Sequence, residues 1–142
     1  MKVAIMQPYF MPYIGYWQLL YSVDTFVIFD DVHYINKGWI NRNNILVNGS
    51  SNLFTISLKE ASQNKLINQI EIADDFSKFL KTIEMNYKKS PYFSDIYPVI
   101  QSICDYPNKN LAAFVSYSIQ TIANYLELPT TILLSSSIQK NT

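Results

Sequence analysis

The first thirty residues constrain the fold more than any other part of the chain. Residues 2–6 form a short apolar run that ends before Pro8, and residues 25–29 form a second apolar run rich in β-branched and aromatic side chains. Between them, apolar residues recur at helical spacing over positions 13–21. Strands that are apolar throughout are typical of sheets covered on both faces, and a helix between two of them predicts a βαβ unit with parallel strands.

The middle of the chain predicts a β-hairpin. Residues 43–58 hold two apolar segments separated by the turn dipeptide Asn48-Gly49, and the polar residues 50–52 that follow it predict a longer or bulged turn. Residues 67–72 alternate between apolar and polar side chains, which predicts a half-exposed strand.

The second half of the chain is predicted to be mainly helical. Asp74 and Asp75 stand where acidic residues cap a helix, Pro98 would kink or end the next helix, and Asn108 is a candidate cap for a long third one. The apolar run at 130–134 predicts a last strand.

Together these elements predict an α/β fold with a βαβ start, a mainly parallel sheet, a β-hairpin insertion and flanking helices. The sequence contains no internal repeat, low-complexity tract or linker composition. We therefore expect residues 1–142 to form a single domain.

Composition excludes several classes of function. Acidic and basic residues balance at 11 each, so the chain lacks the net positive charge that binding to a nucleic-acid backbone requires. Cys104 is the only cysteine and His33 the only histidine, which excludes an internal disulfide and a zinc site built from these residue types alone. Cys104 lies in a helical apolar pattern and is predicted to belong to the core. No apolar run approaches the length of a membrane span, and we expect a cytoplasmic protein without membrane insertion.

The loop after the first strand is a candidate ligand site. It carries Gln7, Tyr13 and Gly15, and in open α/β sheets such loops lie at the carboxyl ends of strands, where ligands bind. A polar amide that leaves a buried strand, as Gln7 does, needs a hydrogen-bond partner, which a ligand or a neighbouring backbone group would supply. In the alternative interpretation, the aromatic residues belong to the core and Gly15 permits close packing.

Asp30, Asp31 and His33 follow the second apolar run and are the candidate catalytic residues. A carboxylate there could act as a general base or bind Mg²⁺, and the imidazole could carry a proton. Successive strand residues point to opposite faces, so the two carboxylates can share a pocket only if the strand has already ended. Alternatively, Asp31 caps a turn and His33 is a solvated loop residue.

Basic, aromatic and amide side chains gather between positions 31 and 60, a stretch without an interior acidic residue. The candidate ligand-binding residues here are Lys37, Trp39, Asn41, Arg42 and Lys59. Arginine binds phosphate in a bidentate manner and stacks on aromatic rings, so the segment suits a phosphorylated or nucleotide-linked ligand. The alternative is a solvated hairpin edge whose charges prevent aggregation.

Three blocks of sequence resemble the WbqC-like family: KVAIMQPYFMPYIGY at 2–16, FVIFDDV at 26–32 and KGWINRN at 37–43. A weaker resemblance extends over nearly the whole chain. It implies a role in bacterial surface-polysaccharide biosynthesis, notably of O-antigen, close to nucleotide-activated sugars. It also implies that this sequence corresponds to the N-terminal part of a family member, because members usually continue past the position where it ends.

The strand-loop-helix start is also similar to nucleotidylyltransferase-type α/β domains, which carry a His-x-Gly-His motif at this turn. Here the turn reads Tyr13-Ile14-Gly15-Tyr16, without either histidine. This departure argues against ordinary nucleotidyl transfer, and the similarity rests on fold alone.

Two functional hypotheses follow from the sequence. The first is a group transferase that acts on a nucleotide-linked sugar or a similar anionic metabolite, with Mg²⁺ as the candidate cofactor. The second is a non-catalytic protein that binds such a ligand or a partner, either a second copy of itself or an enzyme of the same pathway. The eleven tyrosines and two tryptophans would supply its association surface.

Overall fold

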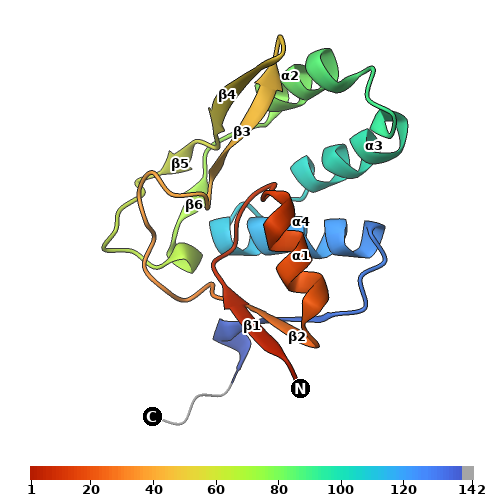
Figure 1. The fold of residues 1–142 in the computed structure, drawn as a ribbon. Coiled ribbons are helices and arrows are strands. Elements are labelled where there is room, and N and C mark those ends of the chain that lie inside the picture. Colours follow the sequence, from red (N-terminus) through yellow and green to blue (C-terminus); the bar gives the residue numbers. More distant parts are fainter. Residues whose placement is uncertain (139–142) are drawn as a thin grey trace.

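The computed structural model describes residues 1–138 (Figure 1). In chain order the elements are β1 (Val3–Met6), α1 (Ile14–Ser22), β2 (Thr25–Ile28), β3 (Arg42–Val47), β4 (Ser50–Thr55), β5 (Leu58–Lys59), the 3₁₀ turn η1 (Ile67–Gln69), β6 (Glu71–Ile72), α2 (Ser77–Tyr87), α3 (Phe93–Cys104), α4 (Leu111–Tyr125), β7 (Thr131–Leu134) and the 3₁₀ turn η2 (Ser135–Ser137). The predicted α/β class, with its parallel sheet, hairpin and flanking helices, is confirmed.

The first and last strands meet in one parallel sheet, with the order β1-β2-β7. Its register places Ala4, Phe26 and Ile132 side by side on the same face. The ring of Tyr16 in α1 packs on that of Phe26 with centroids 5.4 Å apart, and α4 borders Ile28 and Ile132 on the same face. The predicted βαβ start is therefore confirmed, and α1 and α4 lie on the same side of the sheet.

The opposite face of this sheet differs from the prediction that both faces are covered. Val3, Ile5 and Leu133 share this face and are 53%, 57% and 40% exposed. Along the chain, β1, β2 and β7 are added to the sheet in the same direction. Because connections between parallel strands of one sheet are right-handed as a rule, the helices of both connections lie on the same side of the sheet. Val27, which lies between Ile5 and Leu133 in the register, is only 7% exposed, so the exposed part of this face lies on the two edge strands.

The β3-β4 hairpin has a tighter turn than predicted. β4 begins at Ser50, which pairs with Val47, so only Asn48 and Gly49 form the turn. Their φ angles of 51° and 79° lie in the left-handed region that a two-residue type I′ turn requires, and Asn-Gly is a favoured pair for it. The prediction of a longer or bulged turn was wrong because residues 50–52 belong to the strand.

Residues 67–72 form a 3₁₀ turn and a two-residue strand in place of a continuous strand. The side chain of Gln69 accepts a hydrogen bond from the Leu66 amide at 2.8 Å, which closes the turn. β6 then pairs with β5 in an antiparallel ladder.

The capping predictions were partly right. Asp74 and Asp75 accept hydrogen bonds from the amides two residues onward at 2.9 and 3.0 Å and so organise the start of α2. The cap of α4 is Asn110, which accepts from the Ala113 amide at 3.1 Å, whereas Asn108 supports Asn110. Pro98 lies inside α3 and does not end it.

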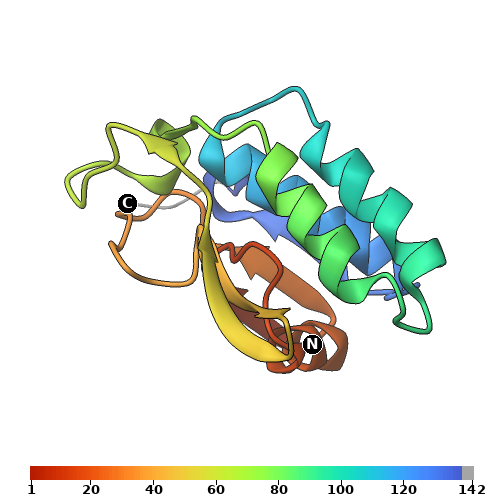
Figure 2. The same cartoon turned by 90° about the horizontal axis from the view of Figure 1, so that it is seen from above.

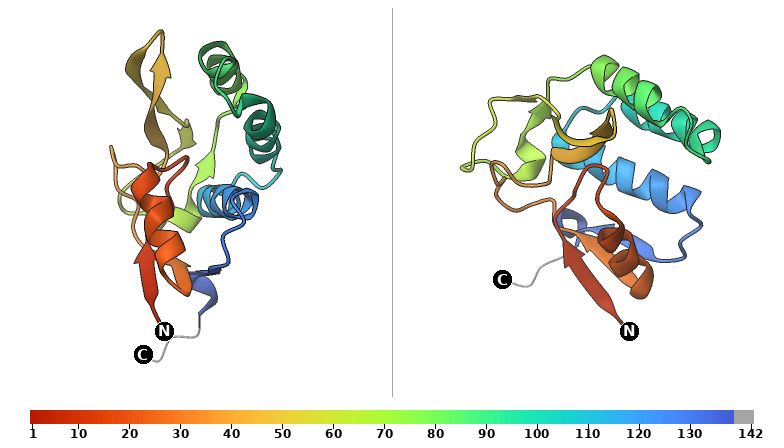
Figure 3. Two further views of the ribbon diagram at one scale, coloured as in Figure 1. Left: turned by 45° about the vertical axis from the view of Figure 1, so that its right-hand side comes forward. Right: turned by 45° about the horizontal axis from the view of Figure 1, so that its top comes forward.

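The core connects two ends of the molecule. The sheet lies at one end and the hairpin with α2 and α3 at the other, with α4 between them (Figures 1 and 3), and α2, α3 and α4 lie side by side (Figure 2). Phe10, which is fully buried, stands where these parts meet. Its ring centroid lies 5.7 to 6.1 Å from the rings of Phe54, Phe76, Phe79 and Phe114.

We expect Phe10→Ala to lower the free energy of unfolding by about 3–5 kcal/mol, because it removes a fully buried ring and leaves a cavity among four others. Urea denaturation followed by circular dichroism measures the change. The control is Tyr21→Ala, which removes a side chain that is 65% exposed and should change stability by less than about 1 kcal/mol. Equal effects of the two variants would contradict a central role for Phe10.

Candidate functional site

Two loops that are distant in the sequence are joined at the carboxyl end of β1. The amide of Phe10 donates to the carbonyl of Ile40 at 3.1 Å, and Nδ2 of Asn43 donates to the carbonyl of Met11 at 2.5 Å. These two bonds hold the loop between β1 and α1 against the segment that leads into β3.

The joined loops form a cavity of about 310 Å³, which we call the aromatic pocket. Its volume is at the lower end of the range for small-molecule sites. It is lined by Tyr9, Pro12, Tyr13, Trp39, Asn43 and Asn44. The structure thus brings together two residues predicted from sequence, Tyr13 and Trp39, with side-chain amides at the start of the hairpin.

Two side chains of helix α1 hold the β1–α1 loop, which forms one wall of the aromatic pocket. The hydroxyl of Tyr16 donates to the carbonyl of Gln7 at 2.8 Å, and burial raises the pKa of this phenol, so it remains a neutral donor. The indole of Trp17 donates to the carbonyl of Pro12 at 3.3 Å. The backbone of Gln7 is therefore engaged within the protein.

Gly15 determines where the ring of Tyr13 lies. A Cβ atom built at Gly15 would stand 2.3 Å from Cε2 of Tyr13, so the ring occupies the space that any other residue would fill. Tyr13 remains 66% exposed, with its ring at the mouth of the aromatic pocket.

Arg42 organises the loop that carries Trp39. Its Nε donates to the carbonyl of Gly38 at 3.0 Å, and its Nη2 donates to the carbonyl of Lys37. The guanidinium carbon lies 5.6 Å from the centroid of the Trp39 ring, within the range of a cation–π contact. Lys37 itself is exposed and has a left-handed φ of 58°.

Asn41 and Lys59 lie outside the aromatic pocket. Asn41 is buried, accepts from the hydroxyl of Tyr34 at 2.9 Å and donates to the carbonyl of Ile56 at 3.0 Å, so its amide ties the loop to the hairpin. Lys59 is exposed on β5, and its ammonium lies 3.7 Å from the carboxylate of Glu71.

The two candidate carboxylates meet at the carboxyl ends of β2 and β7. The hydroxyl oxygen of Ser135 lies 3.0 Å from Oδ1 of Asp30 and 2.5 Å from Oδ1 of Asp31, so its single proton is shared between the two carboxylates. Asp30 also accepts from the amide and the hydroxyl of Ser136 at 2.9 and 2.5 Å. β2 ends at Ile28, so both carboxylates follow the strand and can face one serine. We call these four residues the Asp–Ser cluster.

His33 does not join the Asp–Ser cluster through any contact the structure shows. Its side chain is exposed, and its backbone forms an isolated antiparallel bridge with Leu66. Within residues 1–138, no group of three or more histidine, cysteine or acidic side chains could hold a metal ion. None of the helices in this part of the chain is long and apolar enough to cross a membrane.

Sequence reasoning missed four residues that line the aromatic pocket: Tyr9, Pro12, Asn43 and Asn44. Tyr9 and Pro12 belong to the loop that was singled out, and Asn43 adjoins Arg42, so proximity to predicted residues was the available signal. Another cavity, of about 360 Å³ between the hairpin and α2, contains none of the predicted residues.

Fold and site define an α/β protein with a small-molecule-sized pocket beside the carboxyl edge of a parallel sheet. The chain belongs to the WbqC-like protein family, whose model matches residues 7–142. It is 29% identical over 133 residues to the uncharacterized protein Rv1507c of Mycobacterium tuberculosis, an alignment that covers 91% of this chain and 58% of that protein. The chain thus spans less than two thirds of the length of this curated relative. No solved structure matches it.

We expect Asp30→Asn to lower the free energy of unfolding by about 1–3 kcal/mol, because an amide nitrogen would replace one of two oxygens that accept hydrogen bonds in a buried site. Chemical denaturation at pH 7 measures the change. Glu127→Gln, a similar exchange on an exposed side chain, should leave stability within about 0.5 kcal/mol. A stability of Asp30→Asn equal to that of the wild type would show that the cluster does not hold β2 to β7.

We expect Cys104 to resist alkylation in the native protein. Burial raises the pKa of its thiol to about 12, so at pH 8 almost none of the reactive thiolate is present. Iodoacetamide labelling followed by mass spectrometry should show slow modification at pH 8 and fast modification in denaturant. Rapid native labelling would contradict the buried position in α3.

Proposed function

We propose that the aromatic pocket binds an anionic, sugar-containing metabolite such as a nucleotide-linked sugar, and that the protein serves group transfer in surface-polysaccharide biosynthesis, including that of O-antigen. The observation that carries this proposal is the pairing of Tyr13 with Trp39 in one pocket beside the guanidinium of Arg42. The class of pathway is the one that the resemblance to the WbqC-like family implies.

The chemistry of the pocket suits such a ligand. Aromatic faces stack on nucleobases and on the apolar faces of sugar rings, and Tyr13 and Trp39 are both partly exposed. The side-chain amide of Asn44 offers donors and an acceptor for hydroxyl groups, whereas that of Asn43 already bonds to the carbonyl of Met11 and the amide of Asn44. Arg42 uses two of its five N–H groups for loop carbonyls, so the others can bind a phosphate at the rim.

For the reacting groups we propose the Asp–Ser cluster, which lies at the carboxyl edge of the same sheet. Asp30 is buried, accepts two hydrogen bonds from Ser136 and shares the hydroxyl proton of Ser135, so it acts chiefly in positioning. Asp31 is only partly buried and shares the hydroxyl of Ser135, which makes it the better candidate for a general base or Mg²⁺ ligand. His33, exposed three residues after Asp30, remains the candidate proton carrier.

A second function, non-catalytic binding of a protein partner, is favoured by the open face of the sheet. Val3, Ile5 and Leu133 form an apolar surface without charged side chains among them, and such surfaces mark association sites. The partner would be a second copy of the chain or an enzyme of the same pathway. Light scattering of the purified protein distinguishes a monomer from a homodimer.

We expect Trp39→Ala to weaken binding of a recognised nucleotide sugar by at least about tenfold, because one stacking surface is lost. The measurement is isothermal titration calorimetry with UDP-linked and dTDP-linked sugars, with and without Mg²⁺. Tyr92→Ala is the matched control, since Tyr92 is 71% exposed and lies outside the aromatic pocket.

The outcomes separate the two functions. Selective binding that is lost in Trp39→Ala and kept in Tyr92→Ala supports ligand recognition by the aromatic pocket. A protein that binds none of these sugars and forms a dimer that Ile5→Asp disrupts supports the association function. Binding that survives Trp39→Ala unchanged would overturn the assignment of this pocket.

A further inference from the structure

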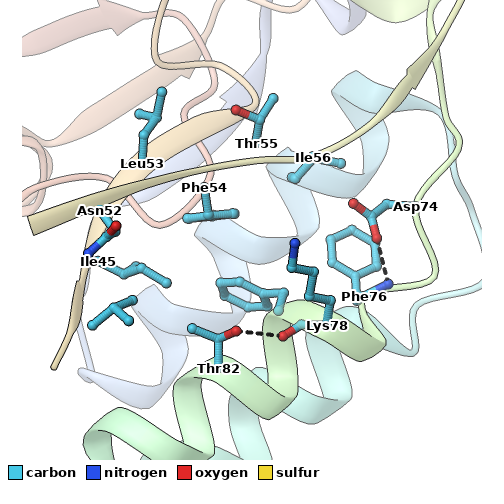
Figure 4. A pocket seen from close by; sticks show the side chains of 12 residues that line it. Ile45, Asn52, Leu53, Phe54, Thr55, Ile56, Asp74, Phe76, Lys78 and Thr82 are labelled. Carbon is cyan, nitrogen blue, oxygen red and sulfur yellow. Dashed lines mark hydrogen bonds between the residues drawn. The ribbon is translucent and has the colours of Figure 1, made fainter.

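A second cavity lies between the β3-β4 hairpin and helix α2 (Figure 4). Its volume is about 360 Å³, within the range of small-molecule sites. We call it the hairpin slot. Its lining residues are Ile45, Val47, Asn52, Leu53, Phe54, Thr55, Ile56, Asp74, Phe76, Lys78, Phe79 and Thr82.

Hydrogen bonds fasten the hairpin to the α2 region at both ends of the slot. Near the start of α2, the amide of Ser57 donates to Oδ2 of Asp74 at 3.2 Å. Near its end, the amide of Leu46 donates to the hydroxyl of Tyr87 at 2.8 Å, and that of Asn48 to the side chain of Asn86 at 2.9 Å. Because these bonds hold the hairpin at a fixed distance from α2 at both ends, the slot is already formed before a ligand binds.

The inner wall of the slot is apolar and aromatic. The rings of Phe54 and Phe79 lie with centroids 4.6 Å apart, and Phe76 stacks on Phe114 at 4.9 Å, so these side chains are held in place by the core. Phe76 and Phe79 are almost fully buried. A ligand in contact with this wall must have an apolar body.

One cation reaches the slot without a partner of opposite charge. Lys78 extends from α2 toward the hairpin in Figure 4, and within residues 1–138 it forms no ion pair. The acidic residue of the slot, Asp74, already accepts from the amides of Phe76 and Ser57 with its two oxygens. Asp74 keeps its negative charge, but it is held by these amides and forms no ion pair with Lys78, so the exposed ammonium is available to an anion in the slot.

We propose that the hairpin slot is a second binding site, for an amphipathic carboxylate such as an acyl chain whose carboxylate pairs with Lys78. The apolar body lies against Phe54 and Phe79. The hydroxyl of Thr82 already donates its one proton to the carbonyl of Lys78 at 2.8 Å, so the ammonium of Lys78 is the donor left for the carboxylate. This site is separate from the aromatic pocket and does not depend on the function proposed for it.

The test uses sodium octanoate and 1-octanol, which share the same apolar chain and differ in charge. We expect octanoate to shift the amide resonances of β4 and α2 in NMR titrations and to bind at least about fivefold more tightly than octanol. Lys78→Gln should reduce the affinity for octanoate to that for octanol and leave octanol binding unchanged. Lys81→Gln, a similar exchange on the same helix outside the slot, is the matched control and should bind octanoate like the wild type.

Two further variants make the result decisive. Thr82→Phe places a ring in the slot and should abolish binding of both probes, with a melting curve that verifies folding. Trp39→Ala should bind octanoate like the wild type, which separates this site from the aromatic pocket. The proposal is overturned if octanoate does not bind, if Lys78→Gln binds it as well as Lys81→Gln does, or if the shifted resonances belong to β1 and β7.

Discussion

The packing of Phe10 is the interaction on which the rest of this structure depends. The residue lies in the loop that follows β1, yet its ring contacts the hairpin through Phe54, helix α2 through Phe76 and Phe79, and helix α4 through Phe114. Aromatic rings bury large apolar areas, so one side chain can hold its own loop, the hairpin, α2 and α4 together. Its amide also bonds to Ile40 and thereby joins the loop to the segment before β3.

Both cavities follow from that arrangement. The bond from Phe10 to Ile40 brings the loop of Tyr13 to the loop of Trp39 and forms the aromatic pocket. The same strand β3 serves both sites, since Asn43 and Asn44 line the aromatic pocket and Ile45 and Val47 line the hairpin slot. The position of one hairpin, fixed by the Phe10 cluster and by α2, therefore sets the shape of both.

Local chemistry made part of the fold and site predictable. The apolar runs and the proline loop identified β1, α1 and β2, and Asp74 and Asp75 marked the start of α2, because each signal acts within a few residues. The loop signals also singled out Tyr13 and Trp39, which line one pocket. Where two local signals competed, prediction failed: residues 50–52 resemble a loop in composition, yet pairing with β3 extends the strand through them.

The sequence by itself determined the types of the elements and their approximate order in the chain. It also identified the polar residues that follow the strands at the carboxyl edge of the sheet. Tertiary structure alone decided which of these residues meet. Asp30 and Asp31 share a hydroxyl of Ser135, more than a hundred positions away, and Lys78 faces a hairpin that precedes it by twenty residues or more. Such contacts depend on the packing of large side chains from several elements at once, and no periodicity within one segment encodes that.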